Sequence, residues 1–381
     1  MRVLHVYRTF FPETQGGLEE AILQICRGVA HHEVESRVLT LAAIPTPDMV
    51  CYNGVEVYRA PRWFEPASCG IGPAALPLLK RHLHWADMVH YHYPWPFADI
   101  LHFLGGGSIP SLLTYHSDVV RQRWLGMIYR PLRDRFLRSM SAIVATSPAY
   151  VATSPVLSRY PERIRVIPLG IDESRYPPVE AELLSRLRDR YGEGFFLFIG
   201  VLRYYKGLQF LLEAARGLAG RVLIVGSGPE DSSLRRRAIE LGLDQVHFLG
   251  QVSDREKVCL LSLARAVVLP SHLRSEAFGV SLLEGAMSGK ALISTALGTG
   301  TDFVNLHSIT GLVVAPADAL QLRRAMSELL DDELAARMGA AARRRYEDLF
   351  TGQRMGRSYA RLYAATAVGM IGMRRQSVLS G

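Results

Sequence analysis

The stretch LPSHLRSEAFGVSLLEGAMSGKALIST, residues 269–295, holds the end of one strand, a loop, a helix and the next strand in a single run. The helix is predicted to begin near Gly279 and to end at Gly289, because glycine is the usual residue in the left-handed position that terminates a helix. A helix that connects two short apolar strands is the repeating unit of an α/β sheet with parallel strands. This stretch therefore predicts the α/β class.

Two acidic residues, Glu276 and Glu284, lie one before the predicted helix and one on it. Between them, the backbone of Ala277, Phe278 and Gly279 lies at the helix N-terminus, where unpaired N–H groups and the helix dipole favour a phosphate. Carboxylates beside a phosphate site are well placed to accept hydroxyls of a ribose or a hexose. The alternative is that both acids are surface residues on an ordinary connection between strands.

The same alternation of short apolar strands and helices extends outward over most of the chain. A break rich in turn residues separates two similar halves near 170–190. We expect two doubly wound, Rossmann-like domains, residues 1–175 and 190–350, with a helix at about 352–373 packing back on the first. Ligands of such sheets bind at the carboxyl ends of the strands, so the cleft between the domains is the expected site. The predicted strands are 3–7, 38–41, 88–91, 111–115, 142–146 and 164–168, then 195–200, 222–225, 246–249, 266–270, 291–295 and 311–314.

Other candidate residues come after predicted strands and are therefore expected at the carboxyl edges of the two sheets. Arg203 and Lys206 follow the strand at 195–200, and two cations can neutralise a leaving diphosphate where no metal does so. Lys206 is favoured because lysine is scarce in this chain. His116 follows the strand at 111–115 and can donate to sugar oxygens or to developing charge. Gly16 and Gly17 follow the first strand and form a candidate anion nest. The alternatives are a solvated loop for the two cations, a structural histidine and a simple tight turn.

Length and composition limit the class of protein. The chain has 381 residues, with 49% hydrophobic and 21% charged residues, which fits two globular domains and excludes a mainly disordered or collagen-like chain. The net charge is +8, and only four of the 44 basic residues are lysines. The excess of arginine fits either the base composition of a genome or contact with phosphates and anionic lipids. Four cysteines without paired spacing favour a reducing cytosol.

Several well-known motifs are absent from the sequence. The chain contains no GxxxxGK[S/T] phosphate loop, and Gly226-Ser227-Gly228 lacks the third glycine of a dinucleotide site. Neither GxSxG nor HExxH occurs, and no Asp-x-Asp pair offers a carboxylate clamp for a metal-bound diphosphate. We therefore expect neither a metal ion nor a cofactor.

Residues 121–140 interleave six arginines with aromatic and aliphatic side chains. A basic amphipathic helix of this kind can lie on an anionic membrane surface. The alternative is a helix that faces the core and has a solvated arginine face. In both cases we expect Pro131 to break or kink the helix. The N-terminus is not a signal peptide, and no run of ~18 apolar residues is present to span a bilayer.

Together these residues resemble the retaining glycosyltransferases of family 4, which have the GT-B architecture. The resemblance covers nearly the whole chain and is densest from Phe198 to Asp318. Within the family, three segments are similar to the common-antigen type of bacterial O-polysaccharide D-rhamnosyltransferases and mannosyltransferases, namely 116–122, 200–207 and 297–305.

The resemblance implies a set of site residues. His116, Glu276 and Lys206 would be catalytic, with Glu276 on the donor sugar, Lys206 on the diphosphate and His116 near the reacting centre. Glu284 would bind the nucleotide ribose. The other donor-binding residues would be Gly16, Gly17, Arg203, Gly226, Val252, Ala277, Phe278 and Gly279. The acceptor and membrane residues would be Asp118, Arg121 and Trp124. One departure is Val201, which replaces the arginine that commonly follows the strand-end glycine, so that Arg203 would reach in instead.

The resemblance also implies the reaction. A hexose would move with retention, and without a metal, from GDP-D-rhamnose or GDP-mannose to an undecaprenyl-diphosphate-linked saccharide in lipopolysaccharide O-polysaccharide synthesis. The protein would be cytoplasmic and peripheral on the anionic inner face of the bacterial inner membrane, with no nucleic-acid partner.

Other functions fit parts of the same pattern. A UDP-sugar-dependent hexosyltransferase of another cell-surface glycan would use the same fold, as would a nucleotide-sugar epimerase. A non-catalytic module that binds a nucleotide or a glycan is also open, because a fold alone does not decide activity.

Overall fold

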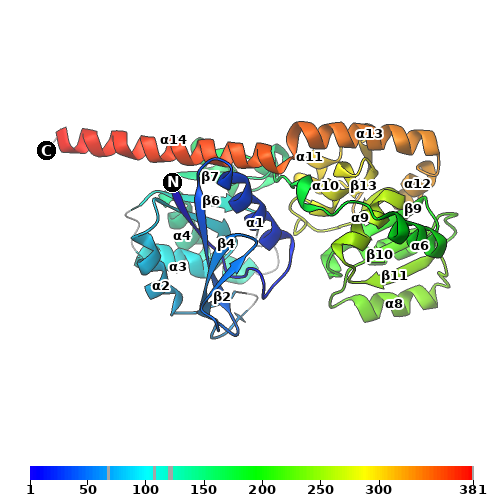
Figure 1. Cartoon of the computed structure of the whole chain (residues 1–381), viewed down its shortest axis with the longest axis horizontal. Helices are drawn as coiled ribbons and strands as arrows, with labels where there is room; N and C mark the ends of the chain where they lie inside the picture. The colour runs from blue at the N-terminus through cyan, green and yellow to red at the C-terminus, as the bar shows by residue number, and fades with distance from the viewer. Residues whose placement is uncertain (67–68, 106–108, 119–122, 380–381) are drawn as a thin grey trace. The chain divides into compact units, whose positions relative to one another are not determined.

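The computed structural model describes residues 1–66, 69–105, 109–118 and 123–379, with side chains left undescribed at 123–128 and 369–379. The chain forms two compact units, each built on its own β-sheet (Figure 1). Unit 1 comprises residues 1–146, 154–170 and 352–381, and unit 2 comprises residues 147–153 and 171–351. The predicted α/β class with two doubly wound domains is confirmed.

Unit 1 is built on an eight-stranded sheet with the order β3-β4-β2-β1-β5-β6-β7-β8. All neighbouring strands are parallel except β3 and β4, and the central strands are buried on both faces, which explains their continuous apolar runs. The strands are β1 (Arg2–Val6), β2 (Glu35–Ala42), β3 (Met49–Tyr52), β4 (Val55–Pro61), β5 (Met88–Tyr93), β6 (Ser111–Tyr115), β7 (Ala142–Ala145) and β8 (Ile164–Val166). The helices are α1 (Gly17–Ala30), α2 (Ala75–Leu83), α3 (Pro96–Gly105), α4 (Arg123–Ser139) and α14 (Gly352–Leu379).

Two features of unit 1 differ from the sequence-based expectation. The hairpin of β3 and β4 was not predicted, although Asn53 and Gly54, with φ of 50° and 81°, are the residues that a tight hairpin turn favours. The sequence predicted that Pro131 would break or kink its helix, and the break is wrong, because α4 runs through Pro131 from Arg123 to Ser139.

The C-terminal helix α14 belongs to unit 1, where it lies beside α1 (Figure 1). The two helices approach closely at Gly28 and Gly356, and a Cβ atom on Gly28 would lie only 2.9 Å from the Gly356 Cα atom. The helix spans Gly352–Leu379 and so ends later than the expected 373.

Unit 2 is built on a six-stranded, all-parallel sheet with the order β11-β10-β9-β12-β13-β14. Its strands are β9 (Phe195–Ile199), β10 (Val222–Val225), β11 (Val246–Gly250), β12 (Ala264–Leu269), β13 (Ala291–Thr295) and β14 (Gly311–Val314). Its helices are α5 (Pro148–Thr153), α6 (Ala181–Tyr191), α7 (Leu208–Ala215), α8 (Asp231–Glu240), α9 (Asp254–Leu263), α10 (Val280–Met287), α11 (Gly300–Val304), α12 (Ala319–Glu328) and α13 (Asp332–Leu349). The short helix α5 groups with unit 2, an assignment that the sequence did not predict.

Candidate active site

The loop between β12 and α10 offers bare backbone amides at the carboxyl edge of the sheet. Gly279 precedes the helix with a left-handed φ of 84°. In the described part of the chain, the N–H groups of Ala277, Phe278 and Gly279 donate to no backbone carbonyl. The loop is held from the other side, where the Thr299 hydroxyl donates to the Glu276 carbonyl at 2.9 Å and the Gly300 N–H donates to the Ala277 carbonyl at 2.7 Å. Such an arrangement suits a phosphate.

Glu276 is a buried carboxylate held in place by two partners. Its Oε2 accepts hydrogen bonds from the Lys206 ammonium and, at 3.0 Å, from the Ser271 hydroxyl. The residue is only 7% exposed. The sequence predicted Glu276 and Lys206 separately, and the structure brings them into one ion pair.

Lys206 is positioned by a short turn that follows β9. The 3-10 helix Tyr204–Lys206 ends at Gly207, whose φ is 72°, and a Cβ atom there would clash with the Pro270 carbonyl oxygen. Burial lowers the pKa of the Lys206 ammonium, but the Glu276 carboxylate outweighs burial, and the net pKa lies above its ordinary value. Lys206 is therefore a cation at neutral pH. Arg203 lies exposed just before this turn, and its charge acts in the opposite direction on the Lys206 pKa.

Glu284 lies in the second turn of α10 and is also buried, at 7% exposed. Its Oε1 accepts a hydrogen bond from the Tyr176 hydroxyl at 3.0 Å. The same oxygen forms an ion pair with the Lys257 ammonium, also at 3.0 Å. Neither partner was predicted from the sequence. The scarcity of lysine that favours Lys206 is a signal that applies equally to Lys257.

The two acids share one arrangement. In each, the protein's contacts fall on a single carboxylate oxygen, Oε2 of Glu276 and Oε1 of Glu284. The other oxygen accepts no hydrogen bond from a described residue and is not fully buried. A carboxylate that is held through one oxygen presents the other as a fixed acceptor for a hydroxyl group. The site therefore offers three free amides between two fixed acceptors.

Gly226 and Val252 lie at the same edge of the sheet. Gly226 follows β10 and donates its N–H to the Gly250 carbonyl at 2.7 Å. A side chain at Gly226 would clash with the Gly200 carbonyl, so this glycine is required for the strand ends to approach each other. Val252 is half-buried in the loop after β11.

Two of the predicted residues of unit 1, His116 and Asp118, directly follow β6. His116 is 5% exposed, and its Nε2 lies 3.0 Å from Nδ1 of His92, a partner that the sequence did not suggest. Asp118 accepts hydrogen bonds from the hydroxyls of Tyr115 at 2.8 Å and Ser154 at 2.9 Å.

Gly16 and Gly17 lie at the start of α1. The Glu19 carboxylate lies against Gly16, where a Cβ atom would be 2.7 Å from Oε2. An anion at this helix N-terminus would therefore meet a negative charge. Arg121 lies outside the described residues, and of Trp124 only the helical backbone is described.

The helix α4 packs against the core of unit 1 through Phe136 and Leu137, which are 1% and 0% exposed. Three arginines surround its buried Asp134, with the Arg159 guanidinium 2.8 Å and the Arg133 guanidinium 2.9 Å from carboxylate oxygens. The third is Arg130, at 3.7 Å. These contacts favour the core-facing alternative for this part of the helix.

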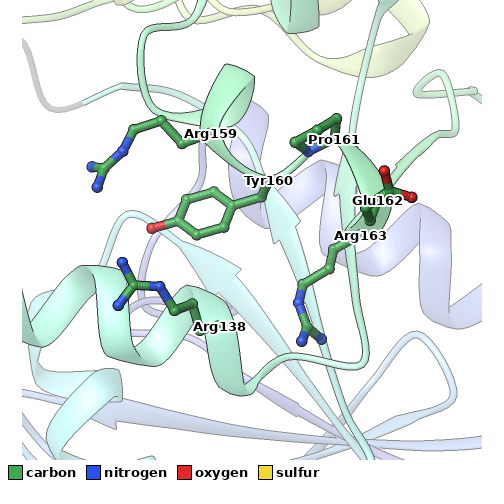
Figure 2. A pocket seen from close by; sticks show the side chains of 6 residues that line it. All are labelled: Arg138, Arg159, Tyr160, Pro161, Glu162 and Arg163. Carbon is green, nitrogen blue, oxygen red and sulfur yellow. The ribbon is translucent and has the colours of Figure 1, made fainter.

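A basic pocket of about 280 Å³ lies beside the end of α4. It is lined by Arg138, Arg159, Tyr160, Pro161, Glu162 and Arg163. Figure 2 shows the Arg138 and Arg159 guanidinium groups on either side of the Tyr160 hydroxyl. Among the described residues, Arg138 has no ion-pair partner. None of the helices in the described residues is long and apolar enough to cross a bilayer.

Comparison with known proteins agrees with this geometry. Residues 182–345 match the family model described as glycosyl transferases group 1, and residues 15–175 match the model described as glycosyltransferase family 4. The D-rhamnosyltransferase WbpZ of Pseudomonas aeruginosa is 49% identical over 352 residues, which are 92% of each chain. The O-antigen chain mannosyltransferase C of Escherichia coli is 42% identical over 95% of this chain and 98% of its own.

Solved structures share the fold. Sucrose-phosphate synthase from Thermosynechococcus elongatus has a TM-score of 0.75 and 22% identity, with full coverage of both chains. WaaG, a glycosyltransferase involved in lipopolysaccharide biosynthesis, has a TM-score of 0.69 and 20% identity, covering 94% of this chain and 99% of its own.

Proposed function

The chain belongs to the group 1 glycosyl transferases of glycosyltransferase family 4, and on that premise we propose that it transfers a mannose-type hexose, D-rhamnose or mannose, in O-polysaccharide synthesis. It is a hexosyltransferase of the retaining, metal-independent kind. The donor would be a GDP-sugar and the acceptor a saccharide linked to undecaprenyl diphosphate. The observation that supports the sugar class is the 49% identity to a D-rhamnosyltransferase over 92% of both chains.

The donor-binding role belongs to unit 2 in this proposal. The amides of Ala277, Phe278 and Gly279 and the ammonium of Lys206 bind the diphosphate. The free oxygen of Glu276 accepts hydroxyls of the sugar, and the free oxygen of Glu284 accepts hydroxyls of the ribose. Gly226 and Val252 border the base, and Arg203 adds positive charge near the diphosphate. The free amides, the largely buried cation Lys206 and the two acids that are each held through one oxygen support these roles.

The chemical step needs no enzymic nucleophile. The bond between the anomeric carbon and the diphosphate oxygen breaks, and the acceptor oxygen bonds to the same face of that carbon. The acceptor proton passes to the departing phosphate oxygen, so charge and atoms balance. Lys206 and the loop amides stabilise the charge that develops on the diphosphate, which is the effect that fixed donors in a dry site provide best.

The acceptor-side roles belong to unit 1. His116 donates a hydrogen bond near the reacting centre, and Gly16 and Gly17 let a hydroxyl of the donor sugar or of the acceptor approach the backbone, because the Glu19 carboxylate beside Gly16 disfavours a phosphate there. Asp118, Arg121 and Trp124 contact the acceptor or the membrane. We further propose that the protein binds peripherally to the anionic cytoplasmic face of the inner membrane. The basic pocket at Arg138 supports this binding, because guanidinium groups suit phosphate headgroups.

A donor screen tests the proposed function. Purified protein is incubated with GDP-mannose, GDP-D-rhamnose, UDP-sugars or dTDP-sugars and a lipid-linked saccharide, and the product is analysed by mass spectrometry and NMR. We expect transfer from a GDP-linked mannose-type sugar with retained configuration, and the same rate after chelation of metals. Transfer from a UDP-sugar alone would overturn the donor assignment. Conversion of the sugar without an acceptor would indicate an epimerase, and binding without turnover a binding module.

A further inference from the structure

Three neighbouring strands of unit 1 place four histidines on one face of the sheet. His5 on β1 lies opposite His90 on β5, and His92 on β5 lies opposite Thr114 on β6. His116 follows Thr114 by two residues and so lies on the same face. All four histidines are buried, at 5% exposed or less. Buried polar side chains in the middle of a sheet need partners, and here three of the histidines are partners of one another.

Three of the four form a hydrogen-bonded row, which we call the histidine row (His5, His92 and His116). Nδ1 of His5 lies 3.1 Å from Nε2 of His92, and Nδ1 of His92 lies 3.0 Å from Nε2 of His116. The row therefore leads from the centre of the sheet to the proposed catalytic histidine at the carboxyl end of β6.

The fourth histidine has other partners, and these argue against a metal site. The ligand atoms of His5, His90 and His92 lie within 4.8 Å of one another, close enough for a metal ion. However, His90 already bonds the Tyr363 hydroxyl and the Thr114 hydroxyl, each at 2.7 Å. Both nitrogens of His92 are used by the histidine row, so among the six ring nitrogens of His5, His90 and His92 only Nε2 of His5 lacks a partner in the described chain. A metal ion would have to break the existing bonds.

The protonation state of the histidine row allows only two arrangements. Burial lowers the pKa of His5 and of His116 to about 3, and that of His92 well below its ordinary value, so the three rings are neutral at pH 7. A neutral imidazole has one N–H and one bare nitrogen. If His5 donates to His92, then His92 must donate to His116. If His116 donates instead, every bond in the row is reversed.

The unpartnered nitrogen of His5 selects between the two arrangements. When His5 donates through Nδ1, its Nε2 is a bare nitrogen without a partner. When the row is reversed, Nε2 is a buried N–H without an acceptor, and such orphan donors are the rarer case in proteins. The first arrangement leaves the proton of His116 on Nδ1. This nitrogen has no partner among the described residues and is not one of the fully buried polar atoms, so it is available to a ligand.

We propose that His92, anchored by His5, is a positioning residue that holds His116 as the Nδ1–H tautomer and directs this N–H outward from the end of β6. The proposal deepens the proposed function and rests on it, because the outward N–H is the group that would donate to the donor sugar or to the developing charge. Neither His5 nor His92 touches the substrate in this account.

The tautomer of His116 can be measured without any substrate. Two-bond ¹⁵N–¹H correlation NMR on histidine-labelled, full-length protein distinguishes a ring with the proton on Nδ1 from one with the proton on Nε2, and a His116→Asn variant assigns the signal. We expect the Nδ1–H form at pH 7.5. Observation of the Nε2–H form in the wild-type protein would overturn the proposal, whether or not any variant folds.

Two variants of matched size test the role of His92. In His92→Asn, the side-chain amide can still donate to Nε2 of His116, so we expect the Nδ1–H form and most of the activity to remain. In His92→Leu, nothing donates to that nitrogen, and a free imidazole prefers the proton on Nε2. We expect a mixture of tautomers and a kcat about tenfold lower, with the donor KM changed by less than about threefold. His5→Leu should act in the same direction and more weakly.

A control separates positioning from stability. His90→Leu removes an equally buried histidine, with its bonds to Tyr363 and Thr114, from the same sheet face but outside the histidine row. It should lower the unfolding midpoint and leave the His116 tautomer unchanged. If His92→Leu keeps the Nδ1–H form and a kcat within twofold of wild type, His92 is only structural. If the wild-type protein transfers no sugar but shows the predicted tautomers, the proposed function fails and the hydrogen-bonded row stands.

Discussion

Lys206 and Glu276 form an ion pair although 70 positions separate them in the sequence, and both side chains are largely buried. The pair joins the turn after β9 to the loop after β12, so it connects the predicted diphosphate cation to the predicted sugar acceptor. A buried pair is strongly destabilised when one partner is removed, because the other charge is then left without compensation. Loss of either residue should therefore also displace the side chain of the other.

We predict that Lys206→Met and Glu276→Gln each lower kcat/KM for sugar transfer by roughly 100-fold or more, because each removes transition-state charge stabilisation or its support. The double variant should cost little more than either single variant, since the two residues act as one unit. Steady-state kinetics on all three proteins measures this coupling.

Lys290 provides the control for charge removal. Its ammonium bonds the Ser262 carbonyl at 2.7 Å just before β13 begins, at the opposite edge of the sheet. Lys290→Met should leave kcat/KM within about twofold of the wild-type value. Full activity in both Lys206→Met and Glu276→Gln would show that this loop is not the active site.

Lys257 is predicted to act on the donor KM through Glu284. In Lys257→Met, the Glu284 carboxylate keeps the Tyr176 hydroxyl and loses its ion pair, so the free oxygen is less firmly oriented toward the ribose. We expect a three- to tenfold higher KM for the donor with kcat nearly unchanged, as roughly one hydrogen bond's worth of binding is lost. Tyr176→Phe should give a smaller effect of the same kind. A fall in kcat at constant KM would contradict a role in ribose binding.

The sequence predicts most strands of this fold because they are buried on both faces. The predicted ranges 111–115, 222–225, 291–295 and 311–314 coincide with β6, β10, β13 and β14. The helix predicted to start near Gly279 spans Val280–Met287, one residue later. The β3–β4 hairpin was missed because its strands are not buried on both faces: β3 alternates between exposed and half-buried residues, and β4 begins by alternating buried and half-buried ones.

The site was less predictable than the fold. Glu276, Glu284 and Lys206 could be proposed as candidates from the sequence because each lies beside a glycine or at a helix start. Their partners Ser271, Lys257 and Tyr176 come from separate segments, and only the fold brings them together. The histidine row was missed for another reason. A histidine inside an apolar strand has no sequence signature that separates a buried polar row from an ordinary strand.

Gly207 is predicted to be intolerant of any side chain. Its φ is 72°, and a Cβ atom would clash with the Pro270 carbonyl oxygen at the start of the loop that follows β12. Gly207→Ala should therefore lower the free energy of unfolding by clearly more than the roughly 1 kcal/mol that the left-handed conformation alone costs. Gly217 is the matched control, because its φ is 69° and a Cβ atom there would meet no other atom within 4 Å. Equal losses in thermal or urea unfolding for the two alanine variants would contradict this explanation.

The buried histidines predict a loss of stability in acid. Folding lowers the pKa of His5 and His116 from 6.5 to about 3, so the unfolded chain binds more protons than the folded chain between these values. Stability therefore rises with pH across this window, by up to about 1.4 kcal/mol per pH unit for each histidine. Asp99 opposes this trend, because burial raises the pKa of its carboxyl group to about 8.

Tryptophan fluorescence reports the unfolding of unit 1, which contains the buried histidines. All four tryptophans of the chain belong to this unit, namely Trp63, Trp85, Trp95 and Trp124. Urea unfolding followed by fluorescence should show a lower midpoint at pH 5 than at pH 7. His92→Asn should reduce the difference by removing one buried titrating group, whereas the exposed His32→Asn should not. A midpoint that is independent of pH between 5 and 7 would contradict neutral, buried histidines.

Membrane binding is predicted to depend on the basic pocket at the end of α4. Arg138 and Arg163 line it and are exposed, and Arg138 has no ion-pair partner in the described chain. An arginine near an anionic surface contributes about 1 kcal/mol, so Arg138→Gln with Arg163→Gln should weaken binding to phosphatidylglycerol vesicles by roughly 20- to 30-fold. Vesicle flotation at low salt and at about 0.5 M salt measures the loss, and binding should also weaken with salt.

A control double variant tests whether the position of the charge matters. Arg236→Gln with Arg344→Gln removes the same charge from exposed positions on helices of unit 2 and should leave binding nearly unchanged. Equal binding by both double variants would locate the membrane contact elsewhere, and binding to neutral vesicles would exclude an electrostatic origin.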